Sequence, residues 1–198
     1  MTAAELGALV AEQFQYFNTP TPQPLQPMPL ANRGVSLYRV CYEIDVIHSD
    51  TTSRQAVSGL LVVPAGVEAG EADLPLAIYT HGTLFGPSEA PTNVVYQGDQ
   101  GWEVGSAETL FNISQLAGMG YALIAPDYVG YGINNLQEGY AVKQPTTEAI
   151  VGLLEASRSV LRDLGVRPSQ LFIEGWSQGA LNAQWTLQNL ESSEVPVA

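Results

Sequence analysis

The segment Leu171–Gly179 reads LFIEGWSQG, and it decides the fold. Its first four residues, Leu171–Glu174, belong to a short and largely apolar run that predicts a buried strand, and a helix is predicted to follow over Gln178–Leu190. Glycines at Gly175 and Gly179 allow strand and helix to approach closely through a sharp turn. Such a turn holds Ser177 in a strained backbone conformation and lifts its side chain above the sheet.

Ser177 is therefore the candidate nucleophile. Its hydroxyl would lie at the N-terminus of a helix, where backbone N–H groups and the helix dipole favour a developing negative charge. The alternative is an ordinary serine in a glycine-rich turn, because a bare G-x-S-x-G pattern also arises by chance. The position between a strand and a helix favours the nucleophile. The neighbouring Trp176 is more typical of packing than of substrate contact.

A second candidate loop follows the predicted strand Leu76–Tyr79 and reads THGT over Thr80–Thr83. Loops at the carboxyl ends of parallel strands gather at one edge of the sheet, so this loop and the turn at Ser177 should lie close together. We interpret His81 as a residue that stabilises the loop, with a role as a base as the alternative.

Backbone N–H groups of these two loops could form an oxyanion hole. The tight turn at Gly82 would aim the N–H of Thr83, or of its neighbour Leu84, at a developing oxyanion. The N–H of Gln178 would be the second donor. The predicted donors are therefore Gln178 and Thr83.

The third candidate loop, PDYVGYG, follows the predicted strand Tyr121–Ala125. Asp127 in this loop could be a catalytic acid. We favour a structural role, in which its carboxylate accepts backbone hydrogen bonds and holds the turn. A long connection, Leu84–Gly105, precedes this part of the chain, and it could either shape a pocket with Tyr96 and Trp102 or be an ordinary surface excursion.

The N-terminal part of the domain has a different pattern, the strict alternation of Val35–His48. The apolar members of this alternation are Tyr38, Val40, Tyr42, Ile44 and Val46. The alternation predicts a half-buried strand. A polar turn at 48–55 leads to a second strand, Ala56–Val63, and the two strands should form an antiparallel hairpin.

Helical periodicity marks residues 2–16, with capping-box spacing between Thr2 and Glu5. The proline-rich stretch 18–29 predicts an extended arm. We therefore divide the chain into an N-terminal helix and arm, 1–34, and a domain, 35–198.

Two further helices, over 106–118 and 146–165, separate the short apolar strands. Apolar strands that alternate with helices predict parallel units whose sheet is covered on both faces. The fold class is α/β: an antiparallel hairpin followed by a parallel, doubly wound sheet.

Composition excludes several classes of protein. The 198 residues carry a net charge of -13, which would repel nucleic acid. The single cysteine, Cys41, cannot form an internal disulfide or a cysteine-based zinc cluster. No stretch approaches the roughly 20 consecutive apolar residues of a membrane span, and the start, with Glu5 and Glu12, lacks the pattern of a signal peptide. The compartment stays open.

The order of HGT, PDYVGYG and GWSQG resembles the α/β-hydrolase superfamily, in its esterase and secretory-lipase-like branch, and the resemblance covers 36–198. It implies that Ser177 attacks an ester carbonyl and forms an acyl-enzyme that water then hydrolyses. It implies a small-molecule ester or lipid substrate, with no metal and no organic cofactor. Gly82, Gly175 and Gly179 would support the loops, with His81.

The resemblance is incomplete after Ser177. The order in the superfamily is serine, then an acid, then histidine. Both histidines, His48 and His81, precede Ser177. We expect a truncation after the helix that follows Ser177, with on the order of 80 to 100 residues missing. The sheet edge exposed in this way could promote self-association.

Two rival functions remain. Acyl transfer or peptide hydrolysis could use the same scaffold, because one fold supports several chemistries. A catalytically inactive fragment or binding module is the other rival, because no histidine follows Ser177.

Overall fold

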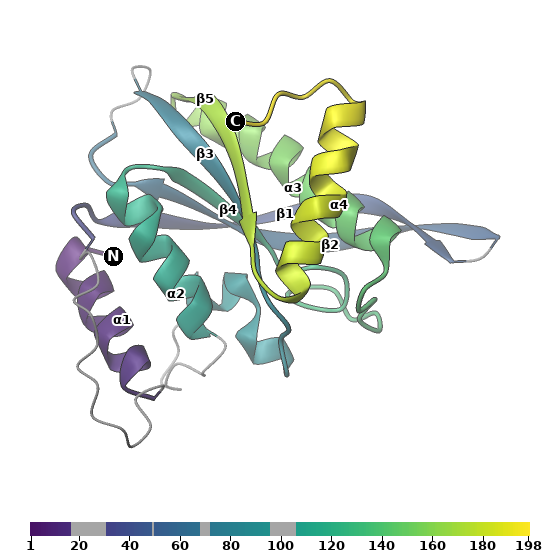
Figure 1. The fold of residues 1–198 in the computed structure, drawn as a ribbon, viewed down its shortest axis with the longest axis horizontal. Helices are drawn as coiled ribbons and strands as arrows, with labels where there is room; N and C mark the ends of the chain where they lie inside the picture. The colour runs from purple at the N-terminus through teal and green to yellow at the C-terminus, as the bar shows by residue number, and fades with distance from the viewer. Residues whose placement is uncertain (17–30, 49, 68–71, 96–105) are drawn as a thin grey trace.

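The computed structural model describes residues 1–16, 31–48, 50–67, 72–95 and 106–198 (Figure 1). The proline-rich stretch lies outside the described residues. So do Tyr96 and Trp102, which were the candidate pocket walls.

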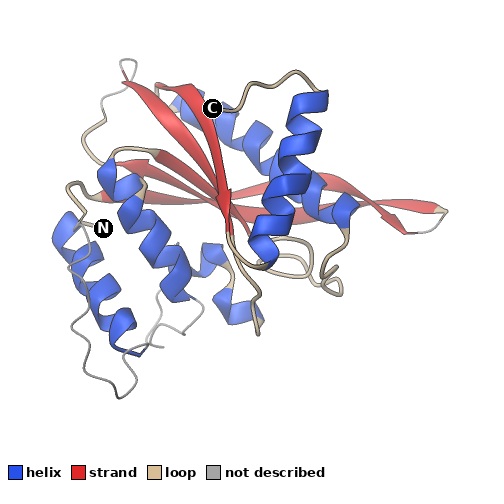
Figure 2. Cartoon of the chain, viewed as in Figure 1, coloured by secondary structure: helices blue, strands red, loops and turns tan. Residues whose placement is uncertain are grey.

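A five-stranded mixed sheet forms the centre of the molecule (Figure 2). Its strands, in chain order, are β1 (Val35–His48), β2 (Thr51–Pro64), β3 (Ala72–Thr80), β4 (Ala122–Pro126) and β5 (Val166–Gly175). Their order across the sheet is β1-β2-β4-β3-β5. β1 and β2 are antiparallel and β2 joins β4 in antiparallel pairing, whereas β3 is parallel to both β4 and β5. The predicted hairpin and parallel sheet are confirmed.

The hairpin is longer than the sequence predicts, because β2 begins at Thr51 and not at Ala56. The polar residues at its start pair with β1 in continuous register, from Ile44 opposite Gln55 to His48 opposite Thr51. The backbone hydrogen bonds between the two strands need no apolar side chains. The prediction of a turn over 48–55 was therefore wrong, because it rested on the polarity of these residues. Figure 1 shows the hairpin projecting beyond the helices.

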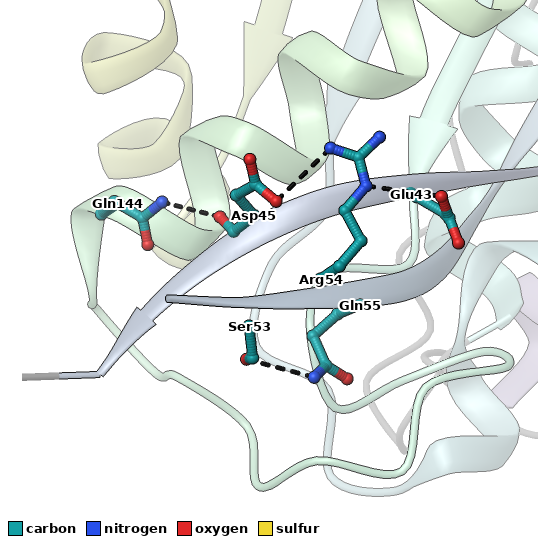
Figure 3. Close-up of polar contacts among 6 residues, drawn as sticks. All are labelled: Glu43, Asp45, Ser53, Arg54, Gln55 and Gln144. Carbon is teal, nitrogen blue, oxygen red and sulfur yellow. Dashed lines mark hydrogen bonds and ion pairs between the residues drawn. The ribbon is translucent and has the colours of Figure 1, made fainter. Parts of the chain in front are cut away.

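Side chains also hold the projecting hairpin together (Figure 3). The guanidinium of Arg54 on β2 lies 3.4 Å from the carboxylates of both Glu43 and Asp45 on β1. The side-chain amide of Gln144 donates to the backbone carbonyl of Asp45 (2.9 Å) and accepts from the N–H of Ile47 (3.2 Å). Gln144 thus anchors the hairpin to the helix α3 (Lys143–Asp163).

Among the described residues, four α-helices and three short 3-10 helices surround the sheet. The α-helices are α1 (Ala3–Tyr16), α2 (Ser106–Gln115), α3 (Lys143–Asp163) and α4 (Gln178–Ser192). The 3-10 helices are η1 (Pro87–Glu89), η2 (Pro91–Val95) and η3 (Ala117–Met119). Helices α1 and α2 cover one face of the sheet, and α3 and α4 cover the other (Figure 1). No helix within the described ranges has the length and apolarity needed to cross a membrane.

Helices α2 and α3 differ most from their predicted ranges. The helix expected over 106–118 ends at Gln115 and continues as η3. The helix expected from 146 starts at Lys143, because Pro145 lies in its first turn, where the missing N–H of proline would have no helical partner. The N-terminal helix has the predicted capping box, since the backbone N–H of Glu5 donates to the Thr2 hydroxyl and that of Thr2 to the Glu5 carboxylate.

Alternate residues of the central strands, together with apolar residues of the covering helices, build two apolar layers. The layer under α3 and α4 includes Leu61, Leu76, Ile78, Ile124 and Leu153. The layer under α1 and α2 includes Leu6, Leu60, Ala77, Leu110 and Leu123. Burial on both faces explains why the parallel strands read as continuous apolar runs.

Candidate active site

The turn between β5 and α4 forces Ser177 into a strained backbone conformation. Ser177 has φ 55° and ψ −124°, a region that residues with a side chain rarely occupy. It immediately precedes the first residue of α4, and it is exposed. Ser177 is therefore a solvent-exposed residue at a helix N-terminus, where a developing anion would be stabilised.

The two glycines of the turn allow it to pack against the end of β3. A side chain at Gly175 would collide with the hydroxyl of Thr80, and one at Gly179 would collide with the Thr80 carbonyl. Because Gly179 also lies against the carbonyl of His81, the turn and the loop after β3 are in direct contact. The two candidate loops are thus brought together at one edge of the sheet, as the topology predicts.

Thr80 links these two loops, a role that sequence reasoning missed. Its side chain is fully buried, and its hydroxyl lies 2.8 Å from both the Glu174 carbonyl and the Gly179 carbonyl. The bonds tie the end of β3 to both sides of the turn around Ser177. A threonine at a strand end is too common to signal such a role in a sequence.

His81 is buried beneath the loop. Only 1% of its surface is exposed, and its ring stacks on that of Tyr128 with centroids 4.0 Å apart. Its Nδ1 lies 2.8 Å from the Gly82 carbonyl. Burial lowers the pKa of His81 to about 4, so the imidazole is neutral at neutral pH. This placement supports the structural interpretation over a role as a base.

The proposed oxyanion donors lie on the two loops in contact. Gln178 is the first residue of α4 and is buried, with its side-chain amide 3.5 Å from the Glu138 carboxylate. Thr83 is half-buried, and the preceding N–H, that of Gly82, donates to the carboxylate of Glu108 on α2 (3.0 Å). Glu108 therefore anchors the loop that carries Thr83, a contact between distant segments that no local motif signals.

Asp127 has no exposed surface and accepts several hydrogen bonds. The hydroxyls of Ser58 and Thr92 donate to its Oδ2 (2.5 and 2.6 Å), and the Thr92 N–H donates to its Oδ1 (2.9 Å). Burial raises the pKa of Asp127, although these hydrogen bonds act in the opposite direction. The carboxylate joins β2, η2 and the loop after β4. It does so through two side chains as well as a backbone group.

The rest of the PDYVGYG loop braces the loop after β3. Tyr128 has a strained φ of 62°, and its hydroxyl donates to the His81 carbonyl (3.3 Å). The Tyr131 hydroxyl lies 3.3 Å from the Leu84 carbonyl and 2.7 Å from the Glu138 carboxylate. The loop around Thr83 is therefore supported from beneath by two tyrosines.

A cavity of about 400 Å³ opens beside the turn. Helix α2 and the ends of β3 and β5 supply its lining: Tyr79, Ala107, Glu108, Phe111, Asn112, Glu174, Gly175 and Trp176. Trp176, next to Ser177, is 61% exposed. The cavity has the size of a small-molecule site.

Comparison with solved structures identifies the fold. A protein from Legionella pneumophila, whose assignment as a hydrolase is provisional, aligns with 100% of this chain at a TM-score of 0.74 and 19% identity. The rice cell wall degrading esterase LipA from Xanthomonas oryzae aligns with 98% of it at a TM-score of 0.71 and 22% identity. The chain has the α/β-hydrolase fold.

The aligned region is only part of these structures. The chain covers 47% of the Legionella protein and 44% of LipA, so it spans less than half the length of either. No protein-family model and no curated protein matches the sequence. At this identity the likeness establishes the fold alone, because one fold supports many chemistries.

Proposed function

We propose that the chain carries the nucleophile and oxyanion hole of a serine ester hydrolase, of the esterase and secretory-lipase-like branch of its fold. The observation that supports this most is the strained and exposed Ser177 at the start of α4. Strain of this kind persists only where the surrounding structure enforces it, and it concentrates at functional sites. The buried Thr80 and the two glycines of the turn supply that enforcement.

The proposed reaction proceeds through an acyl-enzyme. The Ser177 hydroxyl attacks the ester carbonyl and loses its proton to a general base, and the oxygen that becomes negative accepts hydrogen bonds from the N–H groups of Gln178 and Thr83. The alcohol then leaves with a proton, and water hydrolyses the acyl-enzyme to release the acid.

The general base is proposed to lie outside these 198 residues, as is the acid that orients it. His81 is buried under its loop with a pKa of about 4, and His48 lies at the end of β1 in the projecting hairpin. Without a base a serine hydroxyl is a weak nucleophile at neutral pH. The greater length of the aligned structures leaves room for both residues.

Chemical rescue tests the proposal. The chain is treated with a fluorophosphonate probe, with and without added imidazole, and mass spectrometry locates the labelled residue. We expect imidazole to act as the missing base and to increase labelling at Ser177. The control Ser193→Ala, at the other end of α4, should label like the wild type, and Ser177→Ala should not label. Labelling that persists in Ser177→Ala would overturn the proposal.

A non-catalytic binding module is the second candidate. The position of both histidines before Ser177 and the burial of His81 favour it for this chain. Failure of imidazole to promote any labelling would support this candidate. Acyl transfer and peptide hydrolysis remain variants of the first proposal, and product analysis with a competing alcohol acceptor separates them from ester hydrolysis.

A further inference from the structure

The lining of the cavity beside Ser177 includes two carboxylates, which come from different elements of the fold. Glu108 belongs to α2, and Glu174 is the residue before Gly175 at the end of β5. Glu108 Oε1 is engaged by the Gly82 N–H, whereas Glu174 Oε1 is buried without a hydrogen-bond partner among the described residues. Burial raises the pKa of Glu174, and the negative charge of Glu108 raises it further. A positive charge in the cavity would favour the ionised form of Glu174 and so oppose both effects.

No described residue supplies a cation there. The lining contributed by the described residues contains neither lysine nor arginine. The net charge of -13 would in addition attract a positively charged ligand to the molecule.

A second polar group in this cavity, the hydroxyl of Tyr79, also lacks a partner among the described residues. Tyr79 on β3 is 1% exposed, and its hydroxyl lies close to Glu108 and Thr109 without making a hydrogen bond of good geometry to any described residue. Burial and the neighbouring carboxylate raise the pKa of Tyr79, so the hydroxyl remains protonated. Buried polar groups without partners are rare, and a ligand is one explanation for them.

Aromatic rings complete the lining. Tyr79, Phe111 and Trp176 come from β3, α2 and the turn after β5. Aromatic faces combined with carboxylates recognise organic cations, because the ring quadrupole attracts a positive charge that carries an apolar surface. A metal ion instead requires several oxygen ligands, and no cluster of three or more potential metal ligands exists among the described residues.

We propose that this cavity binds a small alkylammonium group, held by the Glu174 carboxylate and the exposed ring of Trp176. The site goes beyond the proposed function, because such binding requires no catalysis by Ser177. Where the proposed function also holds, the cation would lie next to the nucleophile.

Isothermal titration calorimetry at low ionic strength tests the site. Choline chloride is the cationic probe, and 3,3-dimethyl-1-butanol, in which carbon replaces the ammonium nitrogen, is the neutral one. We expect one choline to bind per chain, about tenfold or more tightly than the neutral isostere. Glu174→Gln and Trp176→Ala should each weaken choline binding about tenfold.

Glu155→Gln is the matched control, because it removes the same charge from an exposed position on α3. It should bind choline like the wild type. The proposal is wrong if choline binds no better than the isostere, or if Glu155→Gln weakens binding as much as Glu174→Gln. Trp176 is exposed, so Trp176→Ala tests the site even if Glu174→Gln fails to fold. A chain that binds choline but does not label at Ser177 would keep this inference and lose the proposed function.

Discussion

The turns after β5 and β4 share one backbone feature and differ in how they expose it. Each places a residue with a side chain at positive φ, Ser177 at 55° and Tyr128 at 62°. Ser177 is exposed, whereas Tyr128 is 3% exposed and packs on His81. Backbone strain alone therefore does not identify a reactive residue. The strained residue that faces solvent can meet a substrate, and the buried one braces the loop beside it.

Among the substitutions that test this comparison, removal of the buried Asp127 carboxylate should change the free energy of unfolding most. Asp127→Ala leaves the donors of Ser58 and Thr92 without their acceptor, so the free energy of unfolding should fall by about 3 to 5 kcal/mol. Ser177→Ala removes an exposed hydroxyl and should change it by about 0.5 kcal/mol or less. Urea denaturation measures both. Equal losses would mean that the two turns do not differ in the way their exposure indicates.

Acidification should destabilise the folded protein through protonation of the buried His81. Its folded pKa of about 4 lies below the ordinary value of 6.5, so the unfolded chain binds the proton more readily. The stability of the wild type relative to His81→Gln should therefore fall by about 3 kcal/mol as the pH drops from about 6.5 to about 4. Asp127 and Glu174, whose raised pKa values act in the opposite direction, are present in both proteins and cancel. A pH-independent difference in urea denaturation would contradict the buried, neutral histidine.

A substitution in the first turn of α4 should disrupt the packing of the turn after β5 against β3. Gly179→Ala places a methyl group into the Thr80 carbonyl, and we expect a loss of about 2 kcal/mol. The sign of this change in stability is informative, because glycine-to-alanine substitution at an exposed position inside a helix raises stability by up to about 1 kcal/mol. Ala180→Gly, at an exposed position one residue on, should cost only about 1 kcal/mol by propensity. Stabilisation by Gly179→Ala in thermal unfolding would show that the turn is not packed on β3.

The smallest expected effect is a gain. Ser177→Gly removes the side chain from a strained backbone and should raise the free energy of unfolding by about 0.5 to 1 kcal/mol. Tyr128→Gly, at the corresponding strained position, should instead destabilise the protein, because a ring packed on His81 is lost. A loss of stability in Ser177→Gly, measured by calorimetry, would mean that no strain is stored at this residue.

Local patterns predicted much of this architecture. The strand and helix on either side of Ser177, the hairpin and the parallel sheet all follow from periodicity and glycine positions. The start of β2 at Thr51 did not, because a polar strand held by ladder hydrogen bonds resembles a turn in sequence. The loops after β3 and β5 were correctly expected to meet, since parallel strands carry their carboxyl ends to one edge.

The amino-acid sequence by itself determined most of the helices and strands and the candidate nucleophile, because the spacing of apolar residues and the glycines around Ser177 act over a few neighbouring positions. Only the tertiary structure decided which polar side chains join distant segments. Thr80 ties β3 to the turn after β5, Glu108 holds the Gly82 N–H from α2, and Asp127 connects β2 to the loop after β4. These contacts depend on burial and on chain crossings far apart in sequence, and no local spacing encodes them.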